Sequence, residues 1–287
     1  MVEYNIGTVA FIILETEDNM VRGMKQMKID QLKEKKHFVL DMDGTFYLGD
    51  KLLDGSLDFV KGVEESGKHF TFFTNNSSKN SSVYQKKLAG MGCYVSESRI
   101  ITSGMVTIEY LKKNYKNCSV FLLGTPMLCE EFCKNGIQLV EEKPDVVVAG
   151  FDTTLTYDKL SRACTFIRRG VPFIATHLDL NCPTETGFIP DCGAICAFIT
   201  ASTGVKPKYL GKPFIETLEY LLEYLDCTKD DMVFVGDRLY TDIAIGADHG
   251  VTTALVLTGE TKRDDLEKSH IKPDIVVDRL ADLIPYL

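Results

Sequence analysis

The sequence predicts an α/β fold, in which the strands of a parallel sheet alternate with helices and a second α/β unit is inserted. Three observations lead to this prediction. From residue 37 onward, short apolar runs alternate with segments whose apolar residues recur at helical spacing, which is typical of a parallel sheet covered on both faces. Polar residues directly follow several apolar runs, within residues 41–76 and again within 211–242. A long middle part with strand-like runs of its own separates these two groups.

The first half of the predicted sheet lies between residues 37 and 76. The apolar runs at 37–40 and 69–73 are predicted strands, because each is short and is followed by turn-forming residues. Between them, the segment 53–66 has apolar residues at helical spacing and ends before Gly67. A glycine in that place is typical of the end of a helix.

The second half begins near residue 214. A helical period at 214–225 precedes a buried strand predicted at 232–235 and a helix predicted at 242–249. Two further short strands are predicted, at 253–257 and 274–277. Strands joined in this way through helices form one parallel sheet with right-handed crossovers.

The middle part contains strand-like runs at 120–123, 146–149 and 173–175, each preceded by helical material. It could continue the same sheet. We favour a separate insertion, because the polar residues within 41–76 and those within 211–242 then lie at one edge of the same sheet. The predicted segments are 31–104 and 208–287 for the core and 105–207 for the inserted α/β domain.

Composition narrows the classes of function. The 287 residues are enough for two moderate domains. A net charge of -9 and the lack of a basic cluster disfavour nucleic acid as a partner. The nine cysteines are scattered through apolar stretches, which indicates reduced thiols and a cytoplasmic protein. Cys129/Cys133 and Cys192/Cys196 could be zinc pairs, but this spacing on a helix more often reflects small core residues.

Residues 1–30 are predicted to be a leader outside the fold. The apolar stretch at 9–14 is too short to span a bilayer, and no Lys or Arg precedes it as in a signal peptide. We therefore expect no membrane association. The leader could be an added strand or a flexible segment. It could also result from a start assigned upstream of the true one, since Met20, Met24 and Met27 are all available as start residues.

The first chemical motif is Asp41 and Asp43, directly after the predicted strand at 37–40. Ligands of open α/β sheets bind at the carboxyl ends of strands. There Asp41 could attack a phosphoryl group and hold it as an aspartyl-phosphate. Asp43 could protonate the leaving oxygen and then deprotonate the attacking water. The alternative is a turn in which the side chains cap their own backbone.

The second motif is Thr74, Asn75 and Asn76, which follow the strand at 69–73. A hydroxyl, two amides and backbone N–H groups at this point can face the oxygens of a phosphate group. The alternative is a helix N-cap, for which these residue types are also common.

Lys212 is the third candidate, at the start of the predicted helix near residue 214. A cation gains nothing from the dipole at a helix start, so an anion is expected nearby. The alternative is a solvated surface lysine.

The fourth motif is Asp237 and Asp242, after the strand at 232–235. Asp237 could join Asp41 and the backbone carbonyl of Asp43 around Mg²⁺, which prefers oxygen ligands, with Asp242 orienting these groups from behind. A cation is needed, because a carboxylate near a phosphate is repelled by on the order of 4 kcal/mol per unit-charge pair. The alternative is capping of a helix N-terminus.

Together these motifs resemble the haloacid dehalogenase-like (HAD) phosphatases, and more closely their NagD-type branch. The resemblance rests on DMDGT at 41–45, TNNSS at 74–78, GKP at 211–213 and GDRLYTDI at 236–243, and it extends from about residue 36 to the end. It implies a Rossmann-like core with a cap domain inserted between the second and third motifs.

The resemblance also implies roles for the motif residues. Asp41 would be the nucleophile and Asp43 the acid/base, with Thr74, Asn75 and Lys212 around the phosphoryl group. The implied magnesium ligands are Asp41, Asp43 and Asp237, supported by Asp242. Members that cleave carbon–halogen bonds lack the second aspartate, so a phosphatase is favoured over a dehalogenase.

The resemblance places the cap loop after residue 175 over the active site. Asp179 matches a recurrent acidic position of related caps, and His177 is a candidate substrate contact, although a lone loop histidine is more often solvated. Cys182 falls near the place where a relative acting on pyridoxal phosphate has a ligand-contacting histidine, which disfavours that substrate.

We therefore predict a Mg²⁺-dependent phosphatase for a small phosphorylated metabolite such as a sugar phosphate, nucleoside monophosphate or phosphoglycolate. A homo-oligomer is the only macromolecular partner that we expect. The alternatives are a phosphotransferase that uses the same intermediate and a non-catalytic binding protein on this scaffold.

Overall fold

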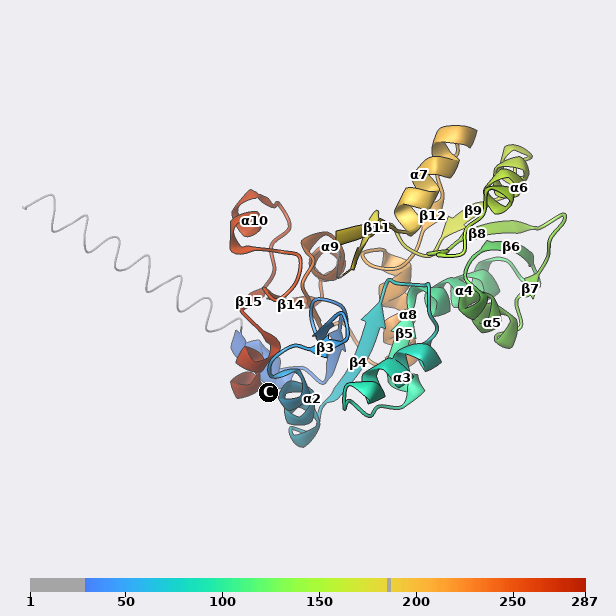
Figure 1. The fold of residues 1–287 in the computed structure, drawn as a ribbon. Helices are drawn as coiled ribbons and strands as arrows, with labels where there is room; N and C mark the ends of the chain where they lie inside the picture. The colour runs from blue at the N-terminus through green and yellow to red at the C-terminus, as the bar shows by residue number, and fades with distance from the viewer. Residues whose placement is uncertain (1–28, 185–186) are drawn as a thin grey trace, which may run out of the picture.

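The computed structural model describes residues 29–184 and 187–287 (Figure 1). The leader predicted for residues 1–30 lies outside these ranges except for its last two residues, as do the three candidate start methionines. The described chain forms two parallel sheets in separate parts of the molecule.

The core sheet has six parallel strands in the order β15-β14-β13-β1-β4-β5. Its strands are β1 (His37–Leu40), β4 (His69–Thr74), β5 (Ile100–Thr102), β13 (Met232–Gly236), β14 (Thr252–Val256) and β15 (Ile275–Val277). The strands predicted from the apolar runs are all present. Only β5 was not predicted.

Helices cover both faces of the core sheet. They are α2 (Ser56–Glu65), α3 (Ser81–Gly90), α4 (Ser103–Asn114), α8 (Ile215–Leu225), α9 (Ala244–His249) and α10 (Arg263–Lys268). Phe38 and Leu40 of β1 pack with α2 and α3 on one face, while Val39 packs with α4, α8 and α9 on the other. Burial on both faces explains why the core strands are almost entirely apolar.

The middle part of the chain builds a second sheet of five parallel strands, in the order β12-β9-β8-β6-β7. Its strands are β6 (Ser119–Leu123), β7 (Gln138–Leu139), β8 (Val146–Ala149), β9 (Phe173–Ala175) and β12 (Lys208–Tyr209), and its helices are α5 (Pro126–Lys134), α6 (Tyr157–Arg168) and α7 (Cys192–Thr203). Helices α6 and α7 pack on one face, and α5 packs with α4 on the other. We refer to this unit as the cap. The predicted α/β fold class, a Rossmann-like core with a cap, is thereby confirmed.

The first of the two connections between these units runs through α4, and the second follows β12. Val106 of this helix packs into the core cluster, whereas Ile108 and Leu111 pack against the cap sheet. Lys208 and Tyr209, which the sequence analysis assigned to the core, pair with β9 of the cap. The domain boundaries at 104/105 and 207/208 stay a prediction.

Short elements complete the fold. Two antiparallel hairpins are formed by β2 (Tyr47–Leu48) with β3 (Lys51–Leu52) and by β10 (Asn181–Thr184) with β11 (Gly187–Pro190). Short helical segments are η1 (Gln31–Glu34), η2 (Glu97–Arg99), η3 (Leu239–Ile243) and η4 (Leu280–Tyr286). The helix predicted at 242–249 is divided into η3, a π-helical turn, and α9.

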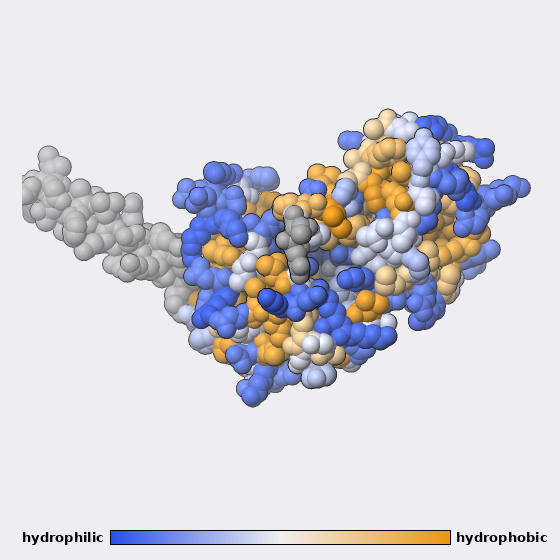
Figure 2. Space-filling model, in the orientation of Figure 1, coloured by the Kyte–Doolittle hydropathy of each residue, from blue (hydrophilic) through white to orange (hydrophobic). Residues whose placement is uncertain are grey.

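The surface of the cap is partly apolar. Figure 2 shows apolar residues gathered over α7 and β11, where Phe188 is 70% and Phe198 50% exposed. Exposed patches of this kind are typical of interaction surfaces, but the predicted homo-oligomer stays a prediction. Within the described ranges, no helix is long and apolar enough to cross a membrane.

A buried carboxyl group joins the cap to the core. Glu131 of α5 is 5% exposed and accepts a hydrogen bond from the Thr102 hydroxyl at 3.4 Å, at the end of β5. The backbone of Ser81, at the start of α3, also hydrogen-bonds to it. Burial raises the pKa of Glu131 from its ordinary 4.5 to about 7.

We expect Glu131→Gln to stabilise the protein at pH 8 and to have little effect at pH 4.5. Because the folded state holds a proton that the unfolded chain releases near pH 4.5, wild-type stability falls between about pH 4.5 and pH 7, by on the order of 3 kcal/mol, and levels off at higher pH. Urea unfolding at both pH values measures the difference. The exposed neighbour Glu130 provides the control Glu130→Gln, and an equal response of the two variants would contradict this account.

Candidate active site

The predicted site residues converge at the carboxyl edge of the core sheet. Leu40, the last residue of β1, is in register with Val235 of β13 and Phe72 of β4, so the polar residues that follow these strands lie side by side. They line a pocket together with residues of the cap. Its lining residues are Asp41, Asp43, Thr74, Asn75, Asn76, Asp179, Cys182, Pro183, Asp191, Lys212, Arg238 and Thr241.

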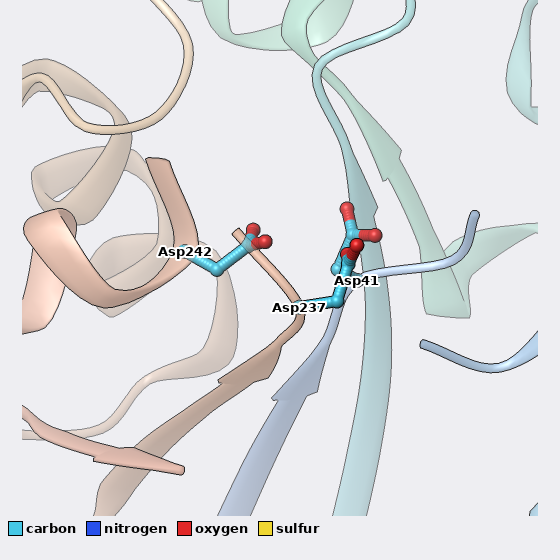
Figure 3. Close-up of side chains that lie close together, drawn as sticks. All are labelled: Asp41, Asp237 and Asp242. Carbon is cyan, nitrogen blue, oxygen red and sulfur yellow. The ribbon is translucent and has the colours of Figure 1, made fainter. Parts of the chain in front are cut away.

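Three carboxylates gather beside this pocket. One oxygen from each of Asp41, Asp237 and Asp242 lies within 4.8 Å of the others. Figure 3 shows the Asp242 side chain extending from its helical turn toward the adjacent side chains of Asp41 and Asp237. The Asp43 carboxylate lines the pocket without joining this group.

Lys212 balances part of this negative charge. Its Nζ lies 2.7 Å from Asp41 Oδ1 and 2.5 Å from Asp242 Oδ1, and it donates to the carbonyl of Phe73 at 3.3 Å. Burial lowers the pKa of Lys212, but Asp242 and Asp41 outweigh this effect and raise it above its ordinary value. The lysine is therefore charged and 2% exposed, and it is not the solvated surface residue considered as the alternative.

One ammonium does not neutralise three carboxylates. Burial raises the pKa of Asp41 to about 8, Lys212 opposes the shift, and Asp242 and Asp237 add to it. Burial and the neighbouring Asp242 likewise raise the pKa of Asp237 to about 7. A buried group of oxygen ligands with this excess of negative charge suits a hard divalent cation.

Glycines make room for the Asp237 carboxylate. Gly44 has a φ of +91°, and a Cβ there would lie 2.6 Å from Asp237 Oδ2; a Cβ on Gly259 would lie 1.9 Å from the same atom. The backbone N–H of Glu260 donates to this oxygen at 2.6 Å, and the Thr45 hydroxyl donates to Oδ1 at 3.3 Å. The turn after β1 thus orients the carboxylate of Asp237, which follows the neighbouring strand β13.

Asp43 lines the same pocket as Asp41. Burial raises the pKa of its carboxyl group, against the opposing charges of Lys87, Arg238 and Lys79. A raised pKa favours the protonated form, which a general acid needs.

Thr74, the last residue of β4, and the two residues after it are held by hydrogen bonds. The backbone N–H of Asn76 donates to Thr74 Oγ1 at 3.1 Å. Asn75 Oδ1 accepts from the backbone N–H of Lys212 at 2.8 Å, and its Nδ2 donates to the Lys212 carbonyl at 3.0 Å and to Asp179 Oδ2 at 2.9 Å. The N-cap of α3 is Asn80, so none of the three residues serves as the helix cap considered above.

The two predicted cap residues differ in their placement. Asp179 lines the pocket. The prediction that His177 contacts the substrate is wrong, because the ring has no exposed surface and both nitrogens bind the protein: Nδ1 lies 2.9 Å from Thr176 Oγ1 and Nε2 lies 2.8 Å from Asp191 Oδ1. Burial lowers the pKa of His177, but Asp191 outweighs it and the result is about 9.

Arg238, Cys182, Pro183, Asp191 and Thr241 line the pocket without having been predicted. The available signals were that Arg238 and Thr241 belong to the motif at 236–243 and that Cys182 lies in the cap loop. All nine cysteines are free, and the acidic cluster is the one metal-capable group found among the described residues. Neither cysteine pair considered for zinc belongs to such a group.

Comparison with known proteins agrees with the motifs. A family profile described as haloacid dehalogenase-like hydrolase matches residues 38–138, and a second HAD-hydrolase-like profile matches 209–283. The chain is 34% identical to 5'-nucleotidase YutF of Bacillus subtilis, over 89% of this chain and 100% of that protein. It is also 34% identical to the acid sugar phosphatase of Staphylococcus saprophyticus, over 89% and 99%. The chain belongs to the haloacid dehalogenase-like hydrolases.

Solved structures place the HAD protein in the NagD-type branch. The 4-nitrophenylphosphatase of Thermotoga maritima superposes with a TM-score of 0.87 and 47% identity, covering 89% of this chain and 98% of that one. NagD of Escherichia coli K-12 gives 0.81 and 30%, covering 86% and 98%. The predicted class of enzyme, a phosphoric monoester hydrolase of this family, is confirmed, and the acidic cluster fits a divalent metal ion.

We expect Gly44→Ala to weaken binding of a divalent cation about 10- to 100-fold, because the added methyl group would displace the Asp237 carboxylate. Titration calorimetry with MnCl₂ measures the affinity. Gly67→Ala is the matched control, since Gly67 also has a positive φ (+71°) but no heavy atom within 4 Å of its Cβ position. If both variants bind the cation as the wild type does, the turn after β1 does not shape the metal site.

Proposed function

We propose that this HAD protein is a Mg²⁺-dependent phosphatase that hydrolyses small phosphate monoesters, with Asp41 as the nucleophile. The observation that carries the proposal is the placement of Asp41 in the pocket lining, within the acidic cluster and 2.7 Å from the Lys212 ammonium. A carboxylate in this setting is close to the Lys212 ammonium and would also be close to a divalent cation held by the acidic cluster, and a phosphoryl group requires both kinds of positive charge.

The phosphoryl group would be bound by Lys212 and by the polar groups of Thr74, Asn75 and Asn76, all of which line the pocket. The Asn75 side chain holds the Lys212 backbone through two hydrogen bonds and gives its other amide proton to Asp179, so this side chain fixes the place of Lys212 and of the cap loop. Such oriented donors stabilise developing charge without reorganisation during the reaction.

The reaction would proceed in two displacements. A carboxylate oxygen of Asp41 forms a bond to phosphorus, the bond from phosphorus to the ester oxygen breaks, and Asp43 gives its proton to that departing oxygen. Asp43 then takes a proton from a water molecule that attacks the aspartyl-phosphate. Inorganic phosphate leaves and Asp41 is regenerated.

Mg²⁺ would be held by the carboxylates of Asp41 and Asp237 and the carbonyl of Asp43, with Asp242 in support, and would supply neutralising charge to the phosphoryl oxygens. The acidic cluster also contains a carboxylate oxygen of Asp242. Because Asp242 already pairs with Lys212, its role as an orienting residue stays part of the proposal.

The substrate proposal follows the names of the relatives. These are a 5'-nucleotidase, acid sugar phosphatases and a 4-nitrophenylphosphatase. We propose a nucleoside monophosphate or a sugar phosphate, with a phosphoglycolate-type ester as the third candidate. The nine free cysteines support the proposed cytoplasmic location.

We expect Asp41→Asn to lower kcat with 4-nitrophenyl phosphate at least about 1000-fold, because an amide cannot accept the phosphoryl group. The variant should fold normally, since the change removes one of three mutually repelling carboxylates. Release of inorganic phosphate and thermal unfolding measure both properties, with the exposed Asp58→Asn as control. Normal turnover in the folded Asp41 variant would remove this residue from the nucleophile role.

Removal of divalent ions with EDTA should abolish hydrolysis of 4-nitrophenyl phosphate, AMP and glucose 6-phosphate alike, and added MgCl₂ should restore it. The reason is that Lys212 alone leaves the acidic cluster with excess negative charge, which repels a phosphate dianion. NaCl at equal ionic strength is the control. Undiminished activity in the chelator would show that the cluster does not need a cation.

A further inference from the structure

Arg238 joins the core to the cap within the pocket lining. It directly follows Asp237, and its side chain is 15% exposed. Its Nε lies 3.0 Å from Glu260 Oε2 in the core, and its Nη1 lies 3.5 Å from Asp179 Oδ1 in the cap loop. One guanidinium therefore lies between carboxylates from two domains.

Asp179 depends on this arginine. The residue is 1% exposed, and its Oδ2 accepts the hydrogen bond from Asn75. Its Oδ1 is buried and accepts no hydrogen bond, so the nearby Arg238 charge is the compensation found for it among the described residues. Leaving a buried charge uncompensated in this way is strongly destabilising.

Both residues that pair with Arg238 are also hydrogen-bonded to residues of the proposed mechanism. Asp179 is hydrogen-bonded to Asn75, which holds the backbone of Lys212. On the other side, the backbone N–H of Glu260 donates to Asp237. Displacement of the arginine would thus disturb the phosphate-binding residues through the cap loop.

We propose that Arg238 is a positioning residue that holds the cap loop, through Asp179, in the place where Asn75 and Lys212 can bind the phosphoryl group. The inference rests on the proposed phosphatase function. A planar guanidinium can face two carboxylates from different directions, which the single ammonium of a lysine does less well.

The test is a double-mutant cycle of Arg238→Gln and Asp179→Asn, measured as kcat/KM with 4-nitrophenyl phosphate and Mg²⁺. Each single variant should lose about 10- to 100-fold, and the double variant should lose no more than the worse single variant, because both remove the same contact. Arg238→Lys should recover part of the loss. Arg162→Gln is the matched control, since Arg162 also pairs with two carboxylates, Glu141 and Asp158, on the outside of the cap.

Hydrogen exchange provides a readout that does not need activity. Amides of residues 177–184 should exchange faster in Arg238→Gln and Asp179→Asn, but not in Arg162→Gln. Losses in kcat/KM that multiply in the double variant, or unchanged exchange in this segment, would overturn the proposal. An inactive wild-type protein would instead refute the phosphatase function, and the exchange data would still decide whether Arg238 holds the loop. If Arg238→Gln does not fold, Arg238→Lys and Asp179→Asn allow the same comparison.

Discussion

The structure of the active site depends on a buried imbalance of charge. Lys212 pairs with Asp41 and Asp242, and Asp237 adds a third carboxylate within the same few ångströms. Such a group is unfavourable in a protein interior unless a cation completes it. The positive φ at Gly44 and the closeness of Gly259 allow the chain to assemble these carboxylates despite their repulsion. The carboxylates at this edge of the sheet therefore destabilise the folded state. The large apolar clusters on both faces of the core stabilise it and offset that effect.

The sequence was sufficient to predict the core strands and the residues that follow them. The reason is geometric: parallel strands bring their carboxyl ends to one edge, so Asp41, Asn75 and Asp237 had to become neighbours once their apolar runs were assigned to one sheet. The short strands β5, β7 and β12 were not predicted. Two of them have only two residues each, and strands of this length carry too little periodicity to be distinguished from loops.

The contacts of the cap loop after residue 175 were predicted less well, because its side chains bind residues that are distant in the sequence and leave no local pattern. His177 was expected to contact the substrate, but it is buried against Asp191 at the start of α7. Arg238 lies inside the motif at 236–243, yet its partners come from the cap loop and from the loop between β14 and α10. Pairings between distant charged residues are decided by the assembled structure, and adjacency in the sequence does not reveal them.

The shared helix α4 limits how the two domains can be recombined. Its first turns belong to the core and its later turns to the cap, so it has no surface at which one domain ends cleanly. A chimaera that exchanged caps at residue 105 would join apolar faces that had never packed together. A chimaera preserves both interfaces only if α4 keeps the recipient's core-facing Met105 and Val106 and takes the donor's residues at the cap-facing positions of Ile108 and Leu111, so any transplant of specificity within this branch has to divide this helix by face.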